Sequence, residues 1–112
     1  MTDELAPKPM SASRISLAQM MQPEHANNYG NVHGGWIMKL VDEAGGVAAM
    51  RHAQRRVVTV AIDSMVFRHA IKISDVVILN AEVTYTGKTS IEAEVQVTAE
   101  NPITGQRWQT NT

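Results

Sequence analysis

A carboxylate and an amide stand on either side of a glycine pair in the first half of the chain. Asn27 precedes Gly34-Gly35, and Asp42 follows the pair by about two helical turns. The residues that share a helical face with Asp42 are small or apolar, and such surroundings raise the pKa of a carboxyl group through desolvation. Asp42 is therefore a candidate general base or carboxylate nucleophile. On the pattern alone, a carboxylate hydrogen-bonded to a loop across the helix is an equally good interpretation.

The start of the same helix could bind an oxygen atom that develops negative charge. Backbone N–H groups at a helix N-terminus attract negative charge, and glycine at positions 34 and 35 would let a substrate lie directly on the backbone. The plainer interpretation is that Gly34 and Gly35 only tighten the turn into the helix. Asn27 could position water or a carbonyl group through its amide, but its Asn-rich loop also favours turns. His33 could line the same pocket or simply pack at the helix start.

Several cations and hydroxyl groups could bind the phosphates of a ligand. Each of them alone is typical of an ordinary solvated surface. Gly87-Lys88-Thr89 does not form a P-loop, because Glu82 stands where that motif needs glycine and a hairpin follows instead of a helix. The candidates are Arg55, Arg56, Arg68, Lys88, Thr89 and Ser90.

Other kinds of chemistry are disfavoured by the composition. The chain has no cysteine, which excludes a thiol nucleophile and a cysteine metal site. Its four histidines lack metal-ligand spacing, so we expect no metal ion. No Gly-x-Ser-x-Gly elbow marks a serine hydrolase. The net charge of −1 argues against binding to nucleic acid or to an anionic membrane surface.

One long helix must position the glycine pair and Asp42. Apolar residues recur at helical spacing from Trp36 to His52, and the opposite face is nearly all small residues. A helix that is apolar or small almost all round is usually buried all round. Gly45 and Gly46 predict that another backbone approaches closely, because glycine inside a helix otherwise costs about 1 kcal/mol relative to alanine.

The rest of the chain predicts antiparallel strands. The expected strands are Ile15 to Met21, Val57 to Ser64, Asp75 to Tyr85, Ser90 to Glu100 and a last segment from Gln106 onward. The fold class is therefore α+β, with one long helix inside a curved antiparallel sheet. Residues 1–12 should form a flexible lead-in to a single domain spanning residues 13–112.

Composition also bears on assembly and location. Only 4% of the 112 residues are aromatic, so the core has little surplus stability and a partner subunit would help. The N-terminus lacks the basic-then-apolar order of a signal peptide, and no apolar run could cross a bilayer. We therefore expect a cytoplasmic protein.

The motif Asn27-x-x-Gly30-x-x-x-Gly34-Gly35, followed by Asp42-Glu43, resembles the hotdog-fold acyl-CoA thioesterases of the cytosolic acyl-CoA hydrolase and bacterial short-chain thioesterase group. The resemblance runs from about Ile15 onward. It continues through Arg56-Val57-Val58-Thr59-Val60, Phe67, Gly87-Lys88-Thr89-Ser90 and Glu100-Asn101-x-x-Thr104-Gly105.

The sequence departs from this family in two places. The chain lacks the family's proline-containing turn after Phe67, where it reads Arg68-His69-Ala70-Ile71. The family's last strand also normally runs on beyond residue 112, so we expect the sequence to be a fragment that lacks the end of this strand.

The resemblance implies a hotdog-fold thioesterase that hydrolyses acyl-CoA, with CoA as part of the substrate and no separate cofactor or metal. It implies homodimers with active sites at their interface, often assembled into hexamers. Two alternatives stay open: a non-catalytic acyl-CoA-binding or sensor domain, and a hotdog hydratase or dehydratase using a His–Asp pair. The implied catalytic residues are Asn27 and Asp42, and the implied substrate-binding residues are His33, Gly34, Gly35, Arg56, Arg68, Lys88, Thr89 and Ser90.

Overall fold

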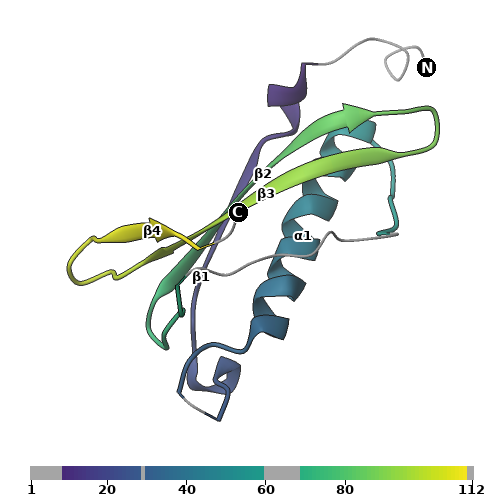
Figure 1. Ribbon diagram of the computed structural model, residues 1–112. Coiled ribbons are helices and arrows are strands. Elements are labelled where there is room, and N and C mark those ends of the chain that lie inside the picture. Colours follow the sequence, from purple (N-terminus) through teal and green to yellow (C-terminus); the bar gives the residue numbers. More distant parts are fainter. Residues whose placement is uncertain (1–8, 29, 60–68, 111–112) are drawn as a thin grey trace.

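A single long helix lies against one face of a four-stranded antiparallel sheet (Figure 1). The computed structural model describes residues 9–28, 30–59 and 69–110. The sheet order follows the chain, β1-β2-β3-β4. The elements are η2 (Met10–Ser13), β1 (Ile15–Met20), η3 (Pro23–His25), α1 (Gly34–Ala53), β2 (Val76–Thr86), β3 (Ile91–Glu100) and β4 (Arg107–Gln109). The predicted α+β class is confirmed.

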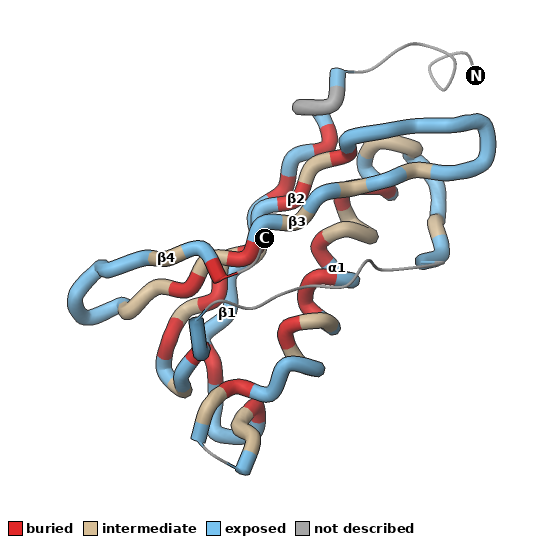
Figure 2. Tube along the Cα trace, in the orientation of Figure 1, coloured by how far each residue is buried: buried red, intermediate tan, exposed pale blue. Residues whose placement is uncertain are grey.

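The core lies between α1 and the sheet. The buried stripe of α1 includes Ile37, Leu40 and Ala44, and it packs against buried side chains of β2 and β3 such as Leu79 and Val97. Figure 2 shows this buried side of the helix turned toward the strands. Burial of a large aliphatic side chain contributes about 1.5–3 kcal/mol, so this layer supplies most of the stabilisation. The predicted alternation of β3 is confirmed, because its apolar residues face the helix side and its Glu and Gln residues are exposed or half-buried.

The other face of α1 differs from the prediction. Within this chain the helix is not buried all round: Lys39, Asp42 and Glu43 are exposed. A Cβ built on Gly45 would meet only a Val95 methyl group at the ordinary distance of 3.5 Å, and one on Gly46 would meet nothing within 4 Å. Among the described residues no other backbone approaches Gly45 or Gly46 closely, so the close approach stays a prediction.

Most predicted element boundaries agree with the structure to within two residues. The exception is the strand predicted from Val57 to Ser64. The described part of it, Val57 to Thr59, carries no strand pairing, and Val58 is 86% exposed. Residues 60–64 lie outside the described residues. The predicted lead-in ends in the single turn η2, which contacts β2 and α1.

The two ends of α1 contact different parts of the chain. At the helix start, the preceding loop meets the segment before β2, where Val32 N–H donates to Ile71 O at 2.7 Å. At the helix end, Arg51 donates to the Arg14 carbonyl at 3.1 Å, and Arg14 pairs with Glu82 on β2. The β2–β3 hairpin projects at this second end (Figure 1). A helix of this length separates the two ends by roughly 30 Å.

A buried serine hydroxyl completes the sheet where the β2–β3 register slips. The pairing shifts between Val83 and Tyr85, and a bulge of this kind disrupts the ladder of hydrogen bonds locally. Ser13 is fully buried, and its Oγ accepts a hydrogen bond from Val83 N–H at 2.8 Å.

Replacing Ser13 by alanine should lower the free energy of unfolding by about 1–3 kcal/mol, because the buried Val83 N–H would lose its acceptor. Urea unfolding followed by circular dichroism measures this change. Ser16→Ala is the matched control, since Ser16 is exposed, and it should change stability by less than about 0.5 kcal/mol. Equal stability of the Ser13 and Ser16 variants would contradict the account.

Candidate functional site

The start of α1 is fixed by two histidines. His33 is the N-cap residue, and its Nδ1 accepts the Gly35 N–H at 3.0 Å. The His25 carbonyl accepts the His33 N–H at 2.7 Å. The buried His25 ring also packs edge-on against Trp36, with 4.6 Å between centroids. These contacts tie the loop to the first helical turn, so the position of Gly34 and Gly35 is set by side chains on both sides of them.

The hydrogen bonding of the Gly35 N–H differs from the sequence-based expectation. The expectation was that it would be available to polarise a carbonyl oxygen, but here it is bonded to the His33 imidazole. His33 lies beside the glycine pair and caps the helix, but it is not among the described residues that line the pocket at the helix start.

Asn27 holds the loop that precedes the helix in a compact turn. Its backbone N–H donates to the Asn31 carbonyl at 2.7 Å, and its Oδ1 accepts the Asn31 N–H at 3.2 Å. Gly30, with a φ of 82°, closes the turn by donating to the Asn27 carbonyl at 3.2 Å. The turn role that the sequence suggested for Asn27 is thus present. It does not exclude a role in binding, because the residue also lines a pocket.

That pocket lies beside the helix start and has a volume of about 250 Å³. Its floor is aliphatic, and amide side chains lie at its edge. Asn27 and Gly34 share it, as the sequence predicted, whereas Asp42 is not among its lining residues. The pocket is lined by Asn27, Asn31, Val32, Gly34, Ile37, His69, Ala70 and Ile71.

Asp42 lies apart from this pocket, on the face of α1 that the other described residues leave largely uncovered. Its Oδ1 accepts a hydrogen bond from Thr59 Oγ1 at 2.6 Å, a length typical of a hydroxyl bonded to a carboxylate. Asp42 is exposed. Sequence reasoning missed Thr59 because the contact spans seventeen positions, beyond any local pattern.

The residues expected to bind phosphate lie away from the pocket. Arg56 follows the end of α1, and Lys88, Thr89 and Ser90 occupy the β2–β3 hairpin loop, all with exposed side chains. Both segments belong to the end of the molecule opposite the pocket (Figure 1). Arg68 lies outside the described residues. The described cations are therefore not gathered around the pocket within one chain.

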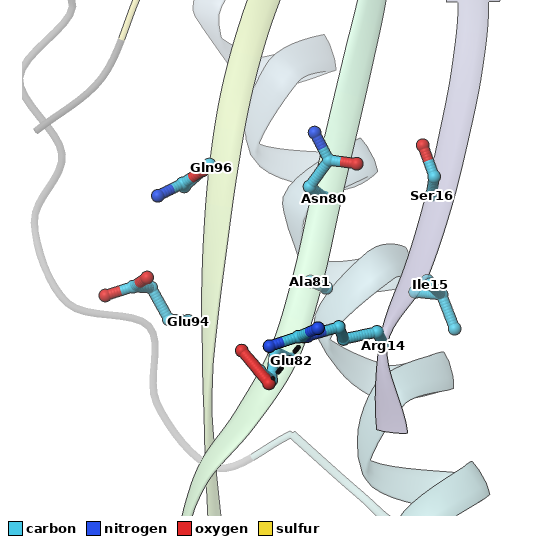
Figure 3. Close-up of a pocket in the computed structure, with 8 residues that line it drawn as sticks. All are labelled: Arg14, Ile15, Ser16, Asn80, Ala81, Glu82, Glu94 and Gln96. Atoms are coloured by element: carbon cyan, nitrogen blue, oxygen red, sulfur yellow. Dashed lines mark hydrogen bonds and ion pairs between the residues drawn. The ribbon is translucent and has the colours of Figure 1, made fainter. Parts of the chain in front are cut away.

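A larger hollow of about 440 Å³ lies on the sheet (Figure 3). It contains two carboxylates, Glu82 and Glu94, which face each other in the β2–β3 register. Arg14 Nε holds Glu82 at 2.9 Å, and Glu94 points away from that ion pair (Figure 3). Because the two carboxylates do not converge, the hollow lacks the geometry for paired acid–base chemistry.

The described residues contain neither a cluster of metal ligands nor a membrane-spanning helix. In the described part of the chain, no three His, Cys, Asp or Glu side chains come together as metal ligands would. No helix of the described residues has both the length and the apolar character needed to cross a membrane.

Comparison with known proteins gives consistent matches. The mouse cytosolic acyl coenzyme A thioester hydrolase is 38% identical over 103 residues, which cover 87% of this chain and 27% of that protein. A hexameric acyl-CoA thioesterase has a TM-score of 0.88 at 36% identity, covering 93% of this chain and 67% of that one. This chain therefore spans about a quarter of the mouse relative and two thirds of the solved thioesterase chain.

An acyl-CoA hydrolase from Staphylococcus aureus, solved in complex with butyryl coenzyme A and coenzyme A, has a TM-score of 0.86 at 31% identity. The match covers 93% of this chain and 63% of that one. Other structures of the same enzyme carry alanine in place of an aspartate, an asparagine or a threonine.

The thioesterase superfamily profile matches residues 29–106. The helix and the four-stranded antiparallel sheet agree with the hotdog fold expected from the sequence. The matched residues cover more than half of the chain and include α1 with its glycine pair. The chain therefore belongs to the thioesterase superfamily.

Proposed function

We propose that this chain hydrolyses acyl-CoA thioesters to a free acid and CoA. The observation that carries the proposal is the superfamily match over residues 29–106, which includes Gly34, Gly35, Asp42 and Thr59. The names of the mouse and S. aureus relatives, and the butyryl-CoA bound to the latter, support acyl-CoA as the substrate. CoA enters as part of the substrate, and the proposal needs no separate cofactor.

Asp42 is the proposed general base or nucleophile. The Thr59 hydroxyl holds Oδ1, which orients the carboxylate so that Oδ2 can take a proton from water or attack the thioester carbon. The leaving thiolate needs no strong acid, because the pKa of a free thiol is about 8.5. Asparagine, aspartate and threonine are also the residue types replaced in the S. aureus variants, which supports Asn27, Asp42 and Thr59 as the corresponding set.

The carbonyl oxygen of the thioester is proposed to lie at the start of α1. Gly34 and Asn27 line one pocket there, so a backbone N–H and a side-chain amide can approach the same substrate atom or its attacking water. Charge that develops on this oxygen is stabilised by the helix N-terminus.

The two alternatives suggested by the sequence have less support. A hydratase would pair a histidine with Asp42, but the hydroxyl of Thr59 holds this carboxylate and His33 caps the helix. A non-catalytic binding domain would not need a carboxylate oriented in this way. The matches to proteins named as hydrolases also favour catalysis.

The active form is proposed to contain at least two copies of the chain. Asn27 and Asp42 lie apart in one chain. The small-residue face of α1 around Asp42 and Gly46, which the other described residues leave largely uncovered, would accept a second helix closely. An antiparallel pairing of two copies would bring Asp42 of one copy, and its basic hairpin at Lys88, toward the pocket of the other. Arg56, Arg68, Thr89 and Ser90 remain proposed contacts for the CoA phosphates in such a pair.

The hexameric state named for one solved relative supports further assembly of such dimers. A cytosolic location, expected from the sequence, is supported by the name of the mouse relative.

Replacing Asp42 by alanine should lower kcat for acyl-CoA hydrolysis by about 10²–10⁴-fold, because the proposed base or nucleophile is removed. Thiol release from a panel of acyl-CoAs measures this. Glu43→Ala is the matched control, because Glu43 is the neighbouring carboxylate and forms an exposed ion pair with Lys39 at 2.9 Å. Equal loss in both variants, or no loss in either, would remove Asp42 from the mechanism.

Thr59→Ala should lower kcat by roughly tenfold, whereas Thr59→Ser should retain most of the activity, since serine keeps the hydroxyl that donates to Asp42. Kinetics with one acyl-CoA distinguish the two variants. If serine were as damaging as alanine, the hydrogen bond would not be the reason for the loss.

Light scattering of the purified protein should give the mass of a dimer or a larger assembly of the 12.3 kDa chain. The uncovered face of α1 is the reason for this expectation. A monomer mass that persists at micromolar concentration, together with full activity, would show that one chain completes the site alone.

A further inference from the structure

His69 is the one ionisable side chain among the described residues that line the pocket beside the helix start. The remaining lining groups are amides, a glycine and aliphatic side chains. His69 is exposed, so a molecule that enters the pocket can reach its imidazole. It also belongs to the segment in which the sequence lacks the proline-containing turn expected from the family resemblance.

One ring contact and the backbone contacts of the residues that follow position His69 at the pocket. Its ring meets Trp108 of β4 edge-on, with 6.4 Å between centroids and 72° between planes. Shortly after it, the Ile71 carbonyl accepts the Val32 N–H at 2.7 Å, and Lys72 forms an antiparallel bridge with Asn31. The segment that carries His69 is thus fixed to the loop before α1.

The pocket is suited to the acyl part of the substrate. Val32, Ile37 and Ile71 are 2–8% exposed and form an aliphatic floor. The volume of about 250 Å³ is below the roughly 300–1,000 Å³ of pockets that hold a whole drug-sized ligand, so only a segment of a CoA thioester fits. Among the described residues, none of those lining the pocket is a lysine or arginine, and the phosphates of CoA would need such cations.

We infer that His69 selects acyl groups that carry a carboxylate or another hydrogen-bond acceptor a short distance from the thioester. This inference rests on the proposed thioesterase function and narrows its substrate class. An imidazole offers at least one N–H donor in either protonation state, and a charged acceptor makes the stronger bond. A plain alkyl chain gains contact with the aliphatic floor but gives the imidazole no acceptor.

Succinyl-CoA and butyryl-CoA provide the test, because their four-carbon acyl groups differ in a terminal carboxylate. His69→Ala should lower kcat/KM for succinyl-CoA by about tenfold and change that for butyryl-CoA by less than about twofold. His69→Gln keeps a donor without a positive charge, so its loss for succinyl-CoA should be smaller than that of alanine. Urea unfolding of each variant should match the parent, because the side chain is exposed.

Lys72→Ala is the matched control for a general effect of nearby positive charge. Lys72 is exposed and close in sequence to His69, but it does not line the pocket, so its replacement should leave the ratio of the two kcat/KM values unchanged. An equal loss for both substrates in His69→Ala, or a loss in Lys72→Ala as selective as that in His69→Ala, would overturn the inference.

A parent protein that hydrolyses neither thioester would refute the proposed function but not decide the role of His69. Calorimetric titration with succinyl-CoA and butyryl-CoA then decides it. Selective weakening of succinyl-CoA binding in His69→Ala would support the inference, and unchanged affinity for both thioesters would refute it.

Discussion

The burial of one apolar stripe of α1 against β2 and β3 determines where every candidate functional group lies. Because successive helical residues are offset by about 100°, seating Ile37, Leu40 and Ala44 on the sheet turns Asp42 to the opposite side, where Thr59 meets it. The same seating places the helix start against the loop that contains Asn27. The core therefore orients two separate features, a pocket at the helix start and a carboxylate on the uncovered face.

Local patterns predicted the elements well because each element is stabilised by its own periodicity. The 3.6-residue repeat marked α1, and the two-residue alternation of β3 and its hairpin to β2 marked the sheet. Asn27 and Gly34, which the pattern grouped, line one pocket. What it could not supply was the surroundings of Asp42. Small residues on a helix face indicate that something packs there, but they do not say whether the same chain provides it.

Contacts between distant segments explain the remaining differences. Thr59 reaches Asp42 from beyond the helix end, and His69 reaches the pocket because Ile71 bonds to Val32. Neither relation follows from spacing along the sequence. The candidates for phosphate binding differ in the opposite way. Arg56 and Lys88 were grouped because both are cations, but the fold places both at the end of α1 that lies away from the pocket. The residue type predicted the chemistry of each side chain, whereas the tertiary structure determined which side chains lie close enough to act together.

The His33 cap bears on how the Gly35 N–H would act in the proposed thioester hydrolysis. A carbonyl oxygen that takes the Gly35 N–H must displace the imidazole nitrogen that already accepts it at 3.0 Å. For an uncharged carbonyl this is an exchange of one neutral acceptor for another, with little net gain. An oxygen that becomes negatively charged is the better acceptor. It therefore displaces the imidazole from the Gly35 N–H more favourably than the neutral carbonyl oxygen does. The cost of displacing the imidazole is the same for both oxygens, so in the proposed reaction the Gly35 N–H would contribute mainly to the transition state, where an added interaction accelerates the chemical step.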